Sequence, residues 1–91
     1  MVVLGKYIIR DEKLEAKVGN DGGVIKGWCL MSEKELTQQL LASLPMNETI
    51  TTNIKSKKRD LKIISIDQKE GRPKGKHATK NIWKFEIKLV K

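Results

Sequence analysis

The sequence predicts an α+β fold, in which an antiparallel sheet of five to six strands carries one α-helix packed on one face. Short apolar, β-branched runs recur along the chain, several with the period of two typical of strands. Only one stretch, about 33–44, repeats apolar residues at helical spacing. Short connections favour antiparallel neighbours, so the expected order is βββαβββ. An OB-like small barrel is the alternative, because it too has a helix between its third and fourth strands.

Three strands are expected before the helix. Val2–Ile9 is an apolar, β-branched run that contains one glycine and one lysine, and Lys13–Val18 alternates apolar with charged residues. Val24–Met31 is the third run. Between the last two lies Gly19–Gly23, which predicts a turn because Gly and Asn reach the positive φ values that chain reversal needs.

The expected helix begins after Ser32 and ends before Pro45. Ser32 and Glu35 match the Ser-x-x-Glu capping box, in which each side chain bonds the other residue's backbone N–H. The residue before a proline is disfavoured in the α region, which ends the helix. The apolar stripe expected to pack on the sheet consists of Leu36, Leu40, Leu41 and Leu44.

Three further strands follow the helix, at Glu48–Lys55, Asp60–Asp67 and Asn81–Val90. Ile63 and Ile64 are adjacent and break the alternation, which predicts either a β-bulge or a central strand covered on both faces. The last run alternates most clearly, and four side chains are expected to point one way, into the core: Trp83, Phe85, Ile87 and Leu89.

The length of 91 residues predicts a single domain over 1–91. The lone cysteine, Cys29, has no partner for an internal disulfide, which fits a reducing compartment and a buried, inert thiol. The N-terminus does not resemble a secretory signal, and no run approaches the roughly 18 apolar residues of a membrane span. We therefore expect a soluble, cytoplasmic (intracellular) protein with no membrane partner.

Positive charge is concentrated in the second half of the chain. The net charge is +8, from 19 Lys and Arg against 11 Asp and Glu. Residues 1–45 contain six basic and six acidic residues, whereas residues 46–91 contain thirteen basic and five acidic ones. Such an asymmetry predicts a polyanionic partner, for which nucleic acid, either DNA or RNA, is the leading candidate.

Segment 69–80 is the strongest candidate contact. It holds five Lys and Arg residues and His77, which would add a pH-sensitive contact, while two glycines and a proline predict a flexible hairpin loop suited to phosphate contacts. A second basic cluster, at 55–59, is expected at the opposite end of the sheet, roughly 25 Å away for eight strand residues. If Lys62, Lys84 and Lys88 share one face, a continuous basic track joins the two. The predicted nucleic-acid-binding residues are Lys55, Lys57, Lys58, Arg59, Lys69, Arg72, Lys74, Lys76, His77, Lys80, Lys84 and Lys88.

No catalytic residue, metal site or cofactor is expected. Gly19–Gly23 lacks the spacing of a phosphate-binding loop. Asp67 and the run Glu86-Ile87-Lys88 resemble the Asp…Glu-x-Lys pattern of metal-dependent nucleases. However, a hairpin closed by 69–80 pairs Asp67 with Ile82, which places Glu86 roughly 13 Å away. That separation is too large for the two carboxylates to share a metal ion.

The sequence therefore predicts a small basic protein, not an enzyme, that binds the phosphate backbone. Because Trp83 and Phe85 are expected in the core, backbone recognition of a duplex or structured RNA is favoured over base stacking. About five phosphate contacts predict a slope of log affinity against log salt near −4 to −5. The alternative is a protein-interaction module, a small inhibitor or assembly subunit that binds an acidic protein surface. Val2–Ile9, as an exposed edge strand, is a candidate for pairing two chains in a homodimer.

Overall fold

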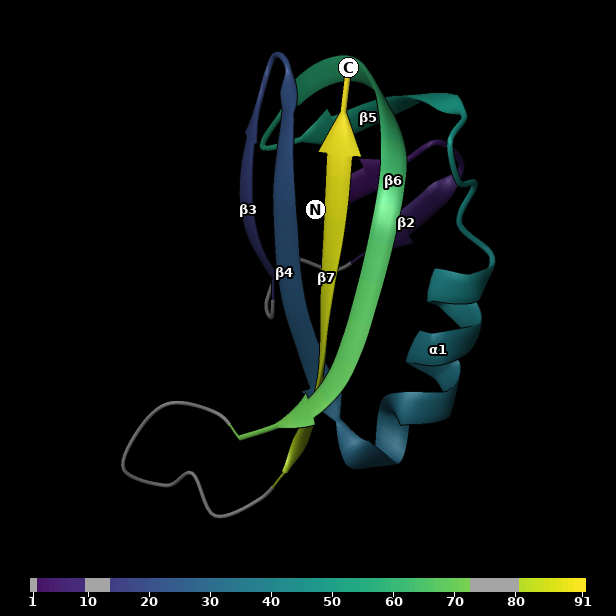
Figure 1. The fold of residues 1–91 in the computed structure, drawn as a ribbon, viewed down its shortest axis with the longest axis vertical. Coiled ribbons are helices and arrows are strands. Elements are labelled where there is room, and N and C mark those ends of the chain that lie inside the picture. Colours follow the sequence, from purple (N-terminus) through teal and green to yellow (C-terminus); the bar gives the residue numbers. More distant parts are fainter. Residues whose placement is uncertain (1, 10–13, 73–80) are drawn as a thin grey trace.

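The computed structural model describes residues 2–9, 14–72 and 81–91, which form one sheet of seven strands and one helix (Figure 1). The strands are β1 (Val2–Leu4), β2 (Tyr7–Ile9), β3 (Leu14–Gly19), β4 (Gly22–Leu30), β5 (Thr49–Ile54), β6 (Lys57–Gly71) and β7 (Ile82–Val90). The helix α1 (Lys34–Ala42) follows a 3-10 turn, η1 (Met31–Glu33). All neighbouring strands are antiparallel, in the order β2-β1-β5-β6-β7-β4-β3. The α+β prediction is confirmed. The sheet is open between β2 and β3, so the barrel alternative is wrong.

The expected single strand Val2–Ile9 is a hairpin instead, which raises the strand count above the predicted five to six. Gly5 has a φ of +65° and lies in the turn between β1 and β2. Its N–H donates to the carbonyl oxygen of Thr51 at 2.9 Å, which fastens this turn to β5. The order is therefore ββββαβββ, and β1 lies inside the sheet between β2 and β5.

The predicted turn between β3 and β4 is confirmed but shorter than expected, because Gly22 and Gly23 belong to β4. Gly19 pairs with Gly22 around a two-residue loop. Gly22 has a φ of +118°, and a Cβ at this position would overlap the carbonyl oxygen of Leu89 on β7. The sequence therefore needs glycine where β4 starts beside β7.

The β6 strand, 15 residues long, joins the two halves of the sheet. It pairs with β5 at its start and with β7 at its end. The register between β6 and β7 shifts between Ile63 and Ser65, and Ile64 is 44% exposed. The bulge predicted from the adjacent isoleucines is therefore confirmed, and it restores the inward alternation for the second part of the strand.

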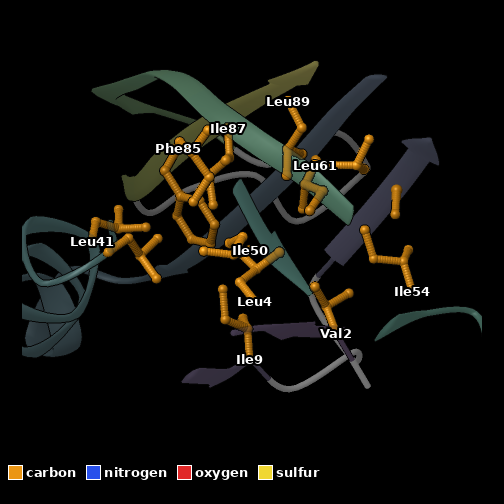
Figure 2. Packing of buried hydrophobic residues seen from close by; sticks show 14 residues of the cluster. Val2, Leu4, Ile9, Leu41, Ile50, Ile54, Leu61, Phe85, Ile87 and Leu89 are labelled. Atoms are coloured by element: carbon orange, nitrogen blue, oxygen red, sulfur yellow. The ribbon is translucent and has the colours of Figure 1, made fainter. Parts of the chain in front are cut away.

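The hydrophobic core lies on the side of the sheet that faces α1. Figure 2 shows side chains of β1, β5, β6, β7 and α1 gathered in this cluster. The fully or almost fully enclosed members include Leu4, Ile25, Ile54, Leu61, Ile63 and Ile87. Burying each such side chain stabilises the fold by roughly 1.5–3 kcal/mol.

The apolar contacts of the helix with the core come from its C-terminal end and the residues just after it. Leu41 and Leu44 are buried and Leu40 is partly buried, but Leu36 is 71% exposed. The capping-box prediction is wrong, because Ser32 lies inside the 3-10 turn. The helix N-cap is Glu33, which makes no side-chain capping bond. No helix among the described residues is long and apolar enough to cross a membrane.

Candidate nucleic-acid interface

The outer face is the side of the sheet turned away from the core. Strand alternation places every second side chain of β3, β4, β6 and β7 on it. Its charged and aromatic residues include seven lysines and four acidic residues. They are Glu15, Lys17, Lys26, Trp28, Lys58, Asp60, Lys62, Asp67, Lys69, Lys84, Glu86 and Lys88.

Two cross-strand pairs of like charge lie next to each other on this face. Lys69 of β6 is directly opposite Lys84 of β7, and we call them the lysine pair. Asp67 is directly opposite Glu86, and we call them the acidic pair. Like charges at directly opposed positions of an antiparallel ladder repel each other, so each pair taken by itself disfavours the folded chain. Each pair also lies diagonal to the opposite charges of the other pair.

A shallow groove of about 240 Å³ lies over the two pairs. Its lining residues are Lys26, Gly27, Asp67, Gln68, Lys69, Lys84, Phe85 and Glu86. The side chain of Lys84 extends from β7 over Gly71 of β6, since a Cβ at Gly71 would overlap the Lys84 Cδ atom. No carboxylate lies within 4.0 Å of the amine of Lys69 or Lys84 among the residues that the structure describes. Neither ammonium group is therefore held in an ion pair with a described residue, although Asp67 and Glu86 line the same groove.

The expected basic track is present on one face but interrupted. Lys62, Lys84 and Lys88 all lie on the outer face, as the track requires. The acidic pair sits between Lys84 and Lys88, so the expectation of continuity is wrong. The outer face instead carries two groups of lysines, with the acidic pair between them.

Strand alternation splits the second basic cluster. Lys55 lies in the turn between β5 and β6, and Lys58 on the outer face. Lys57 and Arg59 alternate to the opposite side of the strand from Lys58. The Arg59 Nε donates to the Asn20 Oδ1 at 3.2 Å. The cluster lies at the far end of β6, as expected. However, Arg59 and Lys69 are ten residues apart on β6, a contour of about 33 Å against the predicted value of roughly 25 Å, and β6 curves along its length (Figure 1).

Segment 69–80 is only partly a loop. Lys69, Glu70 and Gly71 continue β6, since a strand with one solvated face accommodates charged residues. Arg72 is exposed, and its Nε donates to the Asn81 Oδ1 at 3.3 Å across the base of the hairpin. The other predicted contacts of this segment lie outside the described residues: Lys74, Lys76, His77 and Lys80.

The sequence interpretation missed two lysines of the electrically neutral first half. Lys26 of β4 lies directly opposite Glu86 of β7, and Lys17 lies on the same face of β3. The alternation within each run could have shown that both side chains face solvent. The pairing of β4 with β7, which brings Lys26 diagonal to Lys84 and Lys88, follows from no local pattern.

The aromatic residues divide between the two faces. Phe85 is buried, as predicted, but Trp83 is only half-buried on the core side. Its indole N–H donates to the Gln68 Oε1 at 2.9 Å, and the Lys34 Nζ lies 4.4 Å from its ring centroid. Trp28 lies half-buried on the outer face, directly opposite Lys84. The outer face thus places an aromatic side chain next to the lysine pair.

The expected 13 Å separation of Asp67 and Glu86 is wrong, because β6 continues to Gly71 and shifts the hairpin register by four residues. The two carboxylates are directly opposed, with Lys88 two residues further along the same face. Among the described residues, however, no group of three or more His, Cys, Asp or Glu side chains is placed to hold a metal ion.

Cys29 is buried, as predicted, and its Sγ accepts a hydrogen bond from the Thr37 hydroxyl at 3.2 Å. No family model, curated protein or solved structure matches the chain. The charge and strand register of the outer face are therefore the features that indicate a function.

Proposed function

We propose that this chain is a small basic protein that binds DNA or RNA without catalysis, through the phosphate backbone. The observation that carries the proposal is the lysine pair, Lys69 directly opposite Lys84 in an open groove. Two ammonium groups at this position repel each other in the free protein. A bound phosphate offsets that repulsion and gains charge-assisted hydrogen bonds from both.

The acidic pair determines how a nucleic acid would cross the outer face. Asp67 and Glu86 repel phosphate, so contacts form on either side of them. One contact group is the lysine pair, and the other contains Lys62 and Lys88. Lys84 and Lys88 are four strand residues apart, about 13 Å along β7. We infer that the sugar-phosphate backbone of the nucleic acid contacts the outer face at two separated points.

Fluorescence anisotropy with labelled duplex DNA, single-stranded DNA and RNA tests the proposal, each across about 50–200 mM salt. Affinity is expected to fall as salt rises, because bound phosphates release counterions. Lys84→Gln is expected to make the log–log slope shallower by about 0.9. The matched control is Lys6→Gln, which removes one exposed lysine from the β1–β2 turn. Equal slopes for the two variants would contradict the assigned interface.

Competition separates the nucleic-acid proposal from the protein-interaction alternative. Recognition of the nucleic-acid backbone depends on phosphate groups, whose oxygens accept hydrogen bonds from lysine in several directions. Polyglutamate at equal total charge is therefore expected to displace the labelled nucleic acid more weakly than unlabelled nucleic acid does. Equal displacement would favour an acidic protein surface as the partner.

A further inference from the structure

We propose that β3 pairs with β3 of a second copy of this chain and joins two sheets across a two-fold axis. β3 is an end strand of the sheet, with six residues against three in β2, the strand at the other edge. Within the expected edge strand Val2–Ile9, β1 has neighbours on both sides and only β2 lies at an edge. β3 is therefore the longer edge for strand pairing, and the inference concerns assembly, independently of the proposed function.

Among the residues that the structure describes, the backbone of β3 has groups without a strand partner at regular intervals. In an antiparallel ladder, every second residue directs its N–H and C=O away from its partner strand. Gly19 and Gly22 flank a two-residue loop and therefore form a hydrogen-bonded pair. Because such pairs alternate along the ladder, the backbone N–H and C=O groups of Leu14, Ala16 and Val18 point away from β4. These three residues form the template that a further strand would use.

The side chains of β3 are self-complementary about Ala16. An antiparallel copy with the two-fold axis at Ala16 places Glu15 opposite Lys17 of the partner subunit, and Lys17 opposite Glu15 of the partner subunit. On the core side, Leu14 lies opposite Val18 of the partner subunit. Opposite charges and apolar residues at directly opposed positions both stabilise an antiparallel pair. A two-fold interface requires this reciprocity.

Within the six residues of β3, a register centred on a charged residue loses the complementarity. An axis at Lys17 would place two lysines face to face, and an axis at Glu15 would do the same with two glutamates. A shift by one residue would oppose core-facing to solvent-facing side chains. The Ala16 register is therefore the one that the sequence of β3 favours.

The charged side chains of β3 are accessible for this contact. Lys17 and Glu15 are 81% and 65% exposed, and they already form an ion pair at 3.4 Å within the strand. Figure 1 shows β3 at the side of the molecule opposite α1, with no described segment beyond it at the height of the strand. An axis perpendicular to the sheet keeps both outer faces on the same side. The dimer therefore presents two lysine pairs on one surface.

Charge reversal tests the register directly. Sedimentation velocity is measured on the full chain in low-salt buffer, at protein concentrations up to about 1 mM, so that weak association is detected. The wild-type mass is expected to rise from 10.4 kDa towards twice that value. Glu15→Lys and Lys17→Glu each place like charges opposite one another, and each is expected to weaken association by more than about tenfold.

Two combinations make the test specific. An equimolar mixture of the two single variants restores opposite charges across the axis and is expected to form a heterodimer. The double variant, Glu15→Lys with Lys17→Glu, restores them within one sequence and is expected to dimerise like the wild type. Circular dichroism verifies that each variant is folded. A wild-type mass of 10.4 kDa at every concentration would overturn the proposal. So would dimerisation that neither single reversal weakens.

Discussion

Replacing Lys69 by glutamine is expected to change stability and binding in opposite directions. Lys69 is exposed and lies directly opposite Lys84, so the two ammonium groups repel each other in the folded chain. A like-charge pair at this position costs roughly 0.2–1 kcal/mol, which the substitution removes. For a domain of this size, that gain raises the Tm by about 1–8 °C. The same substitution removes one phosphate contact, worth roughly an eightfold change in affinity near 0.1 M salt.

Both effects are measured on one preparation of Lys69→Gln, thermal unfolding by circular dichroism and binding by anisotropy. Added salt screens the repulsion, so the stability gain is expected to shrink as ionic strength rises. Lys6→Gln serves as the control, because Lys6 lies in the β1–β2 turn away from the lysine pair. A lower Tm for Lys69→Gln, or an affinity within about twofold of the wild type, would refute the reasoning.

Three further outcomes are expected. Gly22→Ala is expected to cost about 2–5 kcal/mol in urea unfolding, because the φ of +118° and the neighbouring backbone both exclude a Cβ. A Cβ at Gly19 has room, so Gly19→Ala is expected to unfold near the wild-type urea midpoint. Equal midpoints for Gly22→Ala and Gly19→Ala would contradict the assigned turn. Leu41→Ala is expected to lose about 2–5 kcal/mol, and Leu36→Ala less than about 0.5 kcal/mol, by the same measurement. Wild-type protein with Mg²⁺ is expected to leave labelled DNA and RNA intact on denaturing gels, and cleavage abolished by Asp67→Asn would show that the chain is an enzyme.

The sequence predicted most strands because their residues alternate between a buried and a solvated side. In β7 this pattern correctly assigns Phe85, Ile87 and Leu89 to the core. The bulge at Ile64 was predictable for the same reason, since one extra apolar residue interrupts the alternation. Local composition thus carries the strand content of this chain.

The errors arose where a short turn or a register decided the structure. A single glycine, Gly5, converts one apolar run into two strands. Lys69, Glu70 and Gly71 belong to a strand, and extending β6 by these residues places Glu86, in place of the expected Ile82, opposite Asp67. Composition does not specify where a hairpin closes, because a solvated strand and a solvated loop contain the same residue types.

The positive charge of the candidate interface was predictable from the sequence, but the arrangement of its charged side chains across neighbouring strands was not. The excess of lysine after residue 45 is visible in the sequence, and strand parity places Lys62, Lys84 and Lys88 on one side. The acidic pair that divides them and the contribution of Lys26 depend on which strands are neighbours. Those pairings join segments far apart in the chain, so no local pattern shows them.

The salt dependence of nucleic-acid binding by the wild-type chain tests the central claim most directly. Equilibrium anisotropy titrations across the salt series give the slope of log affinity against log salt. Phosphate contacts at the two lysine groups and the adjoining basic residues predict a slope near −4 to −5, for about five contacts. A slope near zero, or no binding at the lowest salt concentration, would contradict backbone recognition.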